Sequence, residues 1–219
     1  MPTSFHHHIT KMMDWVVRLQ PRTILDIGVG FGKWGFLCRE YLDIFNGRYK
    51  REEWQTRIEG VEAFRAYATP TYDYAYDQIH YGDVREILPT LSGYDLIIIG
   101  DVIEHFEKPV GLELLAEMKR KSSFVLLSSP TEFYPQGDAF ENEFERHLSF
   151  WNIEDFAGGR FDYEEYDNAF VALIRGELPT AMEPRLDGAA AKAVYSRAFI
   201  KRRQRLARLM KNSVRRWYK

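Results

Sequence analysis

The stretch ILDIGVGFGKWGFL, residues 24–37, decides the fold class. It contains most of an apolar run over residues 23–29, which is typical of a strand buried on both faces of a sheet. Four glycines stand in and after this run: Gly28, Gly30, Gly32 and Gly35. Glycine between a strand and a helix permits positive φ in a tight turn and lets a ligand approach the backbone. Because the following helix, expected over 33–45, points free N–H groups at such a ligand, the stretch indicates a nucleotide-like site.

Strand and helix patterns alternate along the rest of the chain. Further strands are predicted at 56–64, in a short segment ending at Asp83, and at 94–102, 122–130, 161–168 and 169–176. Helices are predicted at 9–20, 84–91, 109–121 and 151–159, and the last two strands form a hairpin around Asp167 and Asn168. This alternation predicts an α/β fold with a mostly parallel sheet covered by helices on both faces. Right-handed crossovers bring the carboxyl ends of the parallel strands to one edge.

Acidic residues stand at the ends of these strands. Glu62 ends the second strand, where a carboxylate can accept both hydroxyls of a ribose, and Asp83 ends the third, where it can meet an adenine amine. Asp101 ends the fourth strand. Asp83 and Asp101 could instead cap the helical turns that follow them. No G-K-[ST] sequence follows the glycines, which excludes a P-loop.

Taken together, four motifs resemble those of the class I S-adenosylmethionine-dependent methyltransferases. They are LDIGVGFGKWG, GVE, HYGDV and YDLIIIGDVIEHF, and the resemblance covers residues 20–176. The last contains the D-x-x-E-H form common in methyltransferases of small molecules and glycans. The interval from Gly32 to Glu62 is longer than usual in that family, and residues 43–56 are interpreted as an insertion. The glycines alone would also fit a Rossmann dehydrogenase.

The resemblance implies a Rossmann-like, doubly wound, seven-stranded sheet whose last strand is antiparallel, with S-adenosylmethionine as cofactor. Asp26 would orient the glycine loop and approach the methionine ammonium, and Gly28, Gly30 and Gly32 would wrap the methionine moiety. Glu62 would bind the ribose. Asp83 and Val84 would bracket the adenine, and Asp101 would line the methionine side. Carboxylates suit this ligand because its sulfonium is a cation.

An oxygen acceptor must lose a proton, which makes a histidine base useful. His147 is the preferred candidate and His105 the second, with structural roles as the alternative for both. His147 lies in residues 131–149, a connection long enough to form a binding loop, in which Phe133, Tyr134, Gln136, Phe140, Asn142 and Glu143 could shape the acceptor pocket. The carboxylates could instead build a divalent-metal site, but no tight His/Asp/Glu cluster in the sequence indicates one, and none is expected. The segment GDVIEHF does not match the D-P-P-Y motif of DNA adenine methylation, which favours an oxygen on a sugar, glycan or small metabolite.

The charge is distributed unevenly over the 219 residues. The net charge is −2, but residues 192–219 hold eleven Lys or Arg and no acid, which leaves 19 basic and 32 acidic residues in the first 191, a balance of −13. We expect a methyltransferase domain over 1–176, then a linker and a basic amphipathic helix over 177–219. That helix could dock on the acidic body, lie on an anionic membrane or bind nucleic acid.

Other features bound the location and the function classes. Cys38 is the one cysteine, no apolar run reaches membrane-span length, and a cytoplasmic protein, possibly peripheral to a membrane, is expected. The FHHH segment at 5–8 is short for a purification tag and is interpreted as native. Two alternatives to the O-methyltransferase stay open, namely an RNA methyltransferase held by the basic tail and a methyltransferase-like domain without turnover. The oligomeric state is left undetermined.

Overall fold

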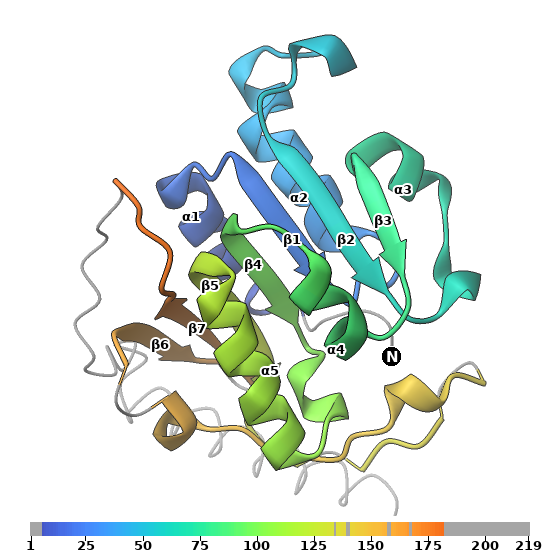
Figure 1. Ribbon diagram of the computed structural model, residues 1–219, viewed down its shortest axis with the longest axis vertical. Helices are drawn as coiled ribbons and strands as arrows, with labels where there is room; N and C mark the ends of the chain where they lie inside the picture. Colours follow the sequence, from blue (N-terminus) through green and yellow to red (C-terminus); the bar gives the residue numbers. More distant parts are fainter. Residues whose placement is uncertain (1–5, 134, 139–140, 157–158, 167, 182–219) are drawn as a thin grey trace, which may run out of the picture.

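The computed structural model describes residues 6–133, 135–138, 141–156, 159–166 and 168–181 (Figure 1). The predicted basic helix at 192–219 lies outside the described residues. Seven strands form one sheet in the order β3-β2-β1-β4-β5-β7-β6. Their bounds are β1 Thr23–Ile27, β2 Arg57–Glu62, β3 Gln78–Tyr81, β4 Tyr94–Gly100, β5 Ser122–Pro130, β6 Phe161–Glu165 and β7 Ala169–Arg175.

The strand directions confirm the predicted fold class. Strands β1 to β5 pair in parallel, and the last strand, β7, runs antiparallel to both of its neighbours, β5 and β6. The strand order reverses between β1 and β4, which both continue into loops at the carboxyl edge of the sheet. In open α/β sheets this switch point is where ligands bind.

Helices cover both faces of the sheet (Figure 1). Helices α1 (Ile9–Leu19), α2 (Lys33–Leu42) and α3 (Pro70–Ala75) lie on one face, and α4 (Val84–Ile87) and α5 (Lys108–Arg120) lie on the other. The connections contain short 3-10 helices: η1 Ile44–Asn46, η2 Arg51–Glu53, η3 Arg65–Tyr67, η4 Leu88–Thr90, η5 Ile103–His105, η6 Glu143–Glu145 and η7 Ile153–Phe156.

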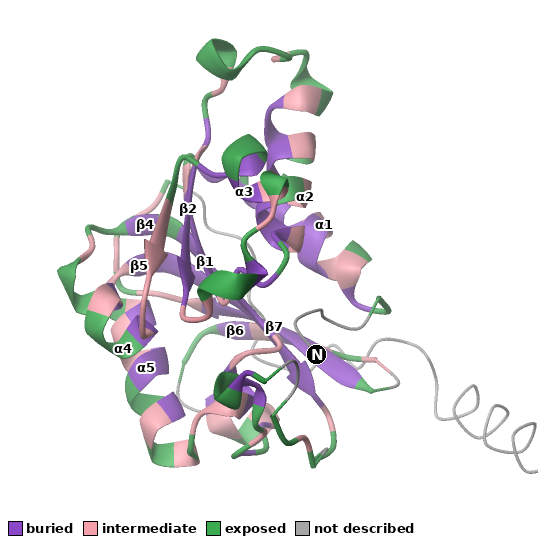
Figure 2. Cartoon of the chain, turned by 90° about the vertical axis from the view of Figure 1, so that its right-hand side faces the viewer, coloured by how far each residue is buried: buried purple, intermediate pink, exposed green. Residues whose placement is uncertain are grey.

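Alternate side chains of each central strand enter the two cores. Ile24 of β1 packs with α1 and α2, whereas its neighbour Leu25 packs with α4 and α5. Leu96 and Ile97 of β4 divide in the same way. Figure 2 shows these buried strands between the two helical layers. A strand buried on both faces needs apolar residues at nearly every position, which explains the continuous apolar runs in the sequence.

The predicted insertion at 43–56 contains η1 and η2, and the buried guanidinium of Arg39 joins its two ends to α2 by bonding Asp43 (2.7 Å) and the carbonyl of Thr56 (2.6 Å). The structure differs from the sequence prediction in two other segments. Helix α3 was not anticipated, because its six residues are too few to show a helical period. The helix predicted at 151–159 is wrong in type, since the described part is the four-residue 3-10 helix η7.

The first residues of the predicted linker are bonded to the domain. The N–H of Glu177 donates to the carbonyl of Lys119, and the N–H of Leu178 donates to that of Ser122. The described chain therefore leaves the sheet at the edge where β5 begins, opposite the switch point. Among the described residues, no helix is both long and apolar enough to cross a bilayer.

Candidate functional site

The glycine loop between β1 and α2 adopts a backbone that side chains disfavour. Gly28 has φ +75° and Gly30 has φ +56°, both in the left-handed region. A Cβ on Gly28 would also overlap the side chain of Val102. Gly32 is the N-cap of α2. Bare backbone is therefore required by conformation at Gly28 and Gly30, and at Gly28 also by the close approach of the loop after β4.

Glu62 at the end of β2 holds this loop in place. Its Oε2 accepts the N–H of Gly30 (2.8 Å), and its Oε1 accepts the N–H of Phe64 (2.8 Å). Burial raises the pKa of this carboxyl above its usual range, although the backbone N–H donors oppose the shift. Each oxygen still has a second lone pair, so Glu62 can both fix the loop and accept a hydrogen bond from a ligand.

Asp26 lies beneath the loop and is completely buried. Its Oδ2 accepts a hydrogen bond from the hydroxyl of Tyr76 (2.5 Å), which in turn accepts the N–H of Gly35 (3.1 Å). Burial raises the pKa of Asp26 to about 7. Through Tyr76, Asp26 is linked to the first turn of α2.

Asp83 caps α4, as the alternative interpretation of the sequence proposed. Its side chain accepts the N–H of Arg85 (2.8 Å) and pairs with the guanidinium of the same residue. Hydrogen bonds from Arg85 hold the pKa of Asp83 below its usual value. Asp83 and Val84 also line a cavity at the carboxyl edge of the sheet, so Asp83 can cap α4 and still contact a ligand.

A cavity of about 510 Å³ opens at the switch point. Of the residues assigned to the cofactor by the sequence, its wall includes Gly28, Gly30, Glu62, Asp83, Val84 and Asp101. Asp26 and Gly32 are buried behind the wall. The structure therefore brings the ends of β1, β2, β3 and β4 to one hollow, as the topology predicted.

The conformation of Asp101 is unusual for a residue with a side chain. Its φ is +55°, and its N–H donates to the carbonyl of Ser128 (2.9 Å). Its Oδ1 accepts the hydroxyl of Ser128 (3.1 Å). Such backbone strain persists only where the surroundings fix it, and it concentrates at functional sites. Asp101 belongs to the cavity wall, so here the strained residue and the hollow coincide.

Both candidate bases lie at the same end of the cavity. The rings of His105 and His147 meet edge to face with centroids 4.9 Å apart, and His105 is part of the cavity wall. Nδ1 of His105 lies 3.1 Å from the carbonyl oxygen of Arg146. A carbonyl only accepts, so Nδ1 carries the hydrogen and Nε2 presents the lone pair. Burial lowers the pKa of His105, which favours the neutral ring.

Glu104 joins the two histidines. Ligand atoms of Glu104, His105 and His147 all lie within 4.8 Å of one another, a grouping that could hold a metal ion. The sequence spacing did not reveal it, because His147 is more than forty residues away. Burial raises the pKa of Glu104 well above its usual range, with the charge of Asp101 adding to the shift. Burial therefore disfavours the charged carboxylate, which is the form that would bind a cation.

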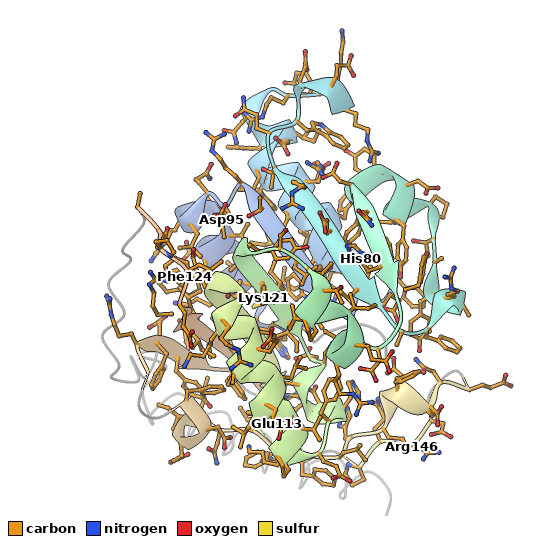
Figure 3. All side chains as sticks on the ribbon, viewed as in Figure 1. His80, Asp95, Glu113, Lys121, Phe124 and Arg146 are labelled. Carbon is orange, nitrogen blue, oxygen red and sulfur yellow. The ribbon has the colours of Figure 1, made fainter. Side chains whose placement is uncertain are left out.

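The loop expected to shape the acceptor pocket folds over the cavity. The N–H groups of Leu148 (2.8 Å) and Ser149 (3.0 Å) donate to the carbonyl of Glu104 and so place His147 beside η5. Of the six residues named from the sequence, Asn142 and Glu143 line the cavity, Gln136 bonds the carbonyl of Glu145 (2.7 Å), and Phe133 is exposed. Tyr134 and Phe140 lie outside the described residues. Figure 3 places Arg146 at this carboxyl edge, far from Asp95 and Lys121 at the opposite edge.

Several wall residues were not found from the sequence. Six of them are apolar side chains of the cavity wall: Trp34, Val102, Phe106, Val110, Phe144 and Leu148. Lys33, Tyr67 and Arg146 also contribute. Lys33 follows Gly32 but is not followed by the Ser or Thr of a P-loop. Its position directly after Gly32 was the one available signal, since the others resemble ordinary core or loop residues.

Comparisons with known proteins agree with this architecture. No protein-family model and no curated protein sequence matches the chain. Solved structures do match, including an O-methyltransferase family protein from Burkholderia thailandensis, with TM-score 0.53, 14% identity, and coverage of 76% of this chain and 55% of that one. A SAM-dependent methyltransferase from Archaeoglobus fulgidus gives TM-score 0.54 at 15% identity over 76% of this chain and 91% of its own. The N-terminal domain of EvdMO1, solved in the presence of SAH and D-fucose, gives TM-score 0.54 at 14% identity, with coverage of 80% of this chain and 85% of that one.

The chain thus has the fold of the class I S-adenosylmethionine-dependent methyltransferases. At these low identities the comparisons establish the fold. The chain spans about half the length of the Burkholderia protein, so the resemblance concerns the domain that the two share.

The raised pKa of Asp26 predicts a pH-dependent stability. An ordinary aspartate titrates near 3.8, whereas Asp26 titrates at about 7, so the folded protein holds a proton that the unfolded chain releases. The stabilisation is complete below about pH 4 and is lost as the pH rises to about 7, on the order of 4 kcal/mol. We expect Asp26→Asn to remove this part of the fall in the free energy of unfolding with rising pH. Urea unfolding of both proteins at several pH values tests it, and identical slopes would contradict it.

Proposed function

We propose that this protein is an S-adenosylmethionine-dependent methyltransferase that methylates a hydroxyl oxygen of a sugar, glycan or small metabolite. One observation carries the proposal. A single cavity joins the glycine loop and its strand-end carboxylates to a histidine whose Nε2 presents a lone pair. The first part is suited to an adenosine-bearing cation, and the second to taking a proton from an acceptor.

The charge of the cavity supports a cationic cofactor. Glu62 and Asp101 lie in its wall, and Asp26 lies directly behind it. Buried carboxylates without a compensating positive charge raise the free energy of the folded state. A sulfonium and an ammonium group supply that charge, and the attraction is strong because the site is partly shielded from water. We assign Gly28 and Gly30 to the methionine moiety, Glu62 to the ribose, and Asp83 and Val84 to the adenine.

Methyl transfer needs little covalent help from the protein. When bound, S-adenosylmethionine would supply the methyl group: the acceptor oxygen would bond to the methyl carbon as the carbon–sulfur bond broke, and the product S-adenosylhomocysteine would be a neutral thioether. The hydroxyl proton passes to the base. Holding the oxygen in line with the carbon–sulfur bond supplies most of the acceleration. Apolar wall residues such as Trp34 and Phe106 would limit the access of water to the reacting groups.

We assign the base to His105. It faces the cavity, whereas His147, which the sequence favoured, packs edge-on against the His105 ring outside the wall. The carbonyl of Arg146 fixes the hydrogen on Nδ1 and leaves Nε2 to accept the proton. His147 then orients and covers the His105 ring.

The structural likenesses are consistent with an oxygen acceptor. The Burkholderia neighbour is described as an O-methyltransferase family protein, and the EvdMO1 domain was crystallised with SAH and D-fucose. Contact of residues 192–219 with a membrane or a nucleic acid stays a prediction. Steep salt dependence of RNA affinity, lost on deleting the tail, would instead favour an RNA acceptor.

Cofactor binding is tested by filling the glycine loop. We expect Gly30→Arg to abolish S-adenosylhomocysteine binding in calorimetry, because a long side chain would occupy the cavity and strain a left-handed backbone. Gly47→Arg is the matched control. Gly47 also has positive φ (+80°), but nothing lies within 4 Å of a Cβ there, so its affinity should equal that of the wild type. Retained affinity in Gly30→Arg would contradict the assignment.

The base is tested by His105→Gln. We expect kcat to fall about 10²- to 10⁴-fold, because proton transfer by a positioned base contributes that factor, while S-adenosylhomocysteine affinity is kept. His147→Gln should lower kcat less. His80→Gln, on β3 in Figure 3 and bonded to Glu59, is a control with no expected loss. A larger loss in His147→Gln than in His105→Gln would transfer the base to His147.

The histidine cluster could also hold a divalent cation, because a carboxylate and two imidazoles suit zinc, manganese or iron. Burial of Glu104 disfavours the charged carboxylate that a metal ion would need, so we expect turnover to survive EDTA. Loss of turnover in EDTA with recovery in Zn²⁺ or Mn²⁺ would assign the cluster to a metal. Glu104→Gln keeps the shape of the side chain without its charge, and in that case it should fail to recover.

A further inference from the structure

His8 is a buried polar residue that the proposed reaction leaves unexplained. It stands just before α1 and is completely buried, whereas His6 and His7 beside it are exposed. A histidine is rarely buried completely without a partner for its ring. A segment that in sequence resembles the remnant of a tag is therefore an integral part of the fold.

The His8 ring packs against the first turn of α2. It stacks on Trp34 with ring centroids 6.2 Å apart and an interplanar angle of 29°. Trp34 in turn lies so close to Gly100 that a Cβ there would overlap its indole nitrogen. His8, Trp34 and Gly100 thus form one contact path from the N-terminal segment to the end of β4.

The polar atoms of His8 face Asp101. Nε2 of His8 lies 3.7 Å from Oδ2 of Asp101, which is longer than an N–H···O hydrogen bond of about 3.2 Å. Neither ring nitrogen of His8 has a hydrogen-bond partner among the described residues, and neither has Oδ2 of Asp101. Because a buried unpaired polar group is costly, two such groups facing each other favour closing the gap by a small side-chain movement.

Asp101 is the residue through which His8 can act on the cavity. It lies in the cavity wall and in a strained left-handed backbone, with Oδ1 held by Ser128. The titratable groups near His8 are Asp101, Lys33, His6 and His7. Of these four, Asp101 is the carboxylate, and its Oδ2 is the acceptor that faces the His8 ring. The charge of Asp101 also raises the pKa of Glu104.

We propose that His8 is a positioning residue of the cofactor site. Its Nε2–H donates to Oδ2 of Asp101 and fixes the carboxylate in the direction that meets the positive charge of the cofactor. The N-terminal segment thereby completes the site. This inference rests on the proposed function, because it assumes a cationic ligand in the cavity.

The test is the affinity for S-adenosylhomocysteine of two variants at His8. His8→Phe keeps a flat ring against Trp34 but cannot donate, so we expect affinity about 10- to 100-fold weaker, the range for a hydrogen bond to a charged group. His8→Gln places an amide N–H near the position of Nε2 and should recover most of the affinity. His7→Phe, at an exposed neighbour, should bind as the wild type does. Melting temperatures confirm that the variants are folded.

A double-mutant cycle tests whether His8 acts through Asp101. Asn tolerates the left-handed backbone but carries no charge, so in the Asp101→Asn background His8→Phe should have no further effect. Equal affinity of wild type and His8→Phe, or an undiminished effect in the Asp101→Asn background, would overturn the inference alone. Absence of binding by the wild type would instead contradict the proposed function.

A measurement without ligand tests the His8 inference independently of the proposed function. Long-range ¹H–¹⁵N spectra of the free protein report the imidazole nitrogens of His8. We expect Asp101→Asn to shift the Nε2 signal and leave those of His6 and His7 in place. An unchanged His8 signal would overturn the pairing with Asp101 whatever the outcome of the binding experiments.

Discussion

The hydrogen bond from the N–H of Gly30 to the carboxylate of Glu62 is the constraint on which the cavity depends. It joins the loop after β1 to the end of β2. The N–H of Gly28 adds a second link to the carbonyl of Val61 (2.9 Å), and the hydroxyl of Tyr72 donates to the carbonyl of Gly30. These contacts hold Gly28 and Gly30 in left-handed conformations, which the unfolded chain would adopt only part of the time. The hollow at the switch point exists because the loop cannot relax into it.

The site gathers carboxyl groups in a place where a negative charge raises the free energy of the folded protein. Asp26, Glu62 and Glu104 are buried, and burial raises the pKa of each. Natural proteins keep such groups where a function compensates their cost. A cationic cofactor offers that compensation, and it explains why acids from three different strand ends converge. It also gives the positioning of Asp101 by His8 a consequence for binding.

The opposite end of the cavity depends on backbone rather than on charge. The carbonyl of Glu104 accepts two N–H groups from the loop at 148–149, which brings His147 to His105. The carbonyl of Arg146 then selects the hydrogen position on the His105 ring. A loop far away in sequence thus determines which nitrogen faces the acceptor. On the same loop, Asn142 and Glu145 bond the hydroxyl of Tyr67 and anchor the pocket to η3.

Residue patterns predicted much of the fold. They also predicted the part of the candidate site that lies directly after the ends of β-strands. Apolar runs identified the central strands, and the glycines and acids after them identified the switch-point edge, because the topology of parallel strands forces those positions together. Helix α3 and the 3-10 helices were not readable, since elements of three to six residues carry no period.

The sequence by itself therefore determined the sheet, the glycine loop and the carboxylates around it, since local spacing and strand direction fix all three. Only the tertiary structure decided that His105 rather than His147 faces the cavity and that His8 lies against Asp101. These outcomes depend on contacts between segments up to about ninety residues apart and on which ring nitrogen of His105 donates its hydrogen to a neighbouring carbonyl. Neither quantity is encoded in the order of residues along any one segment.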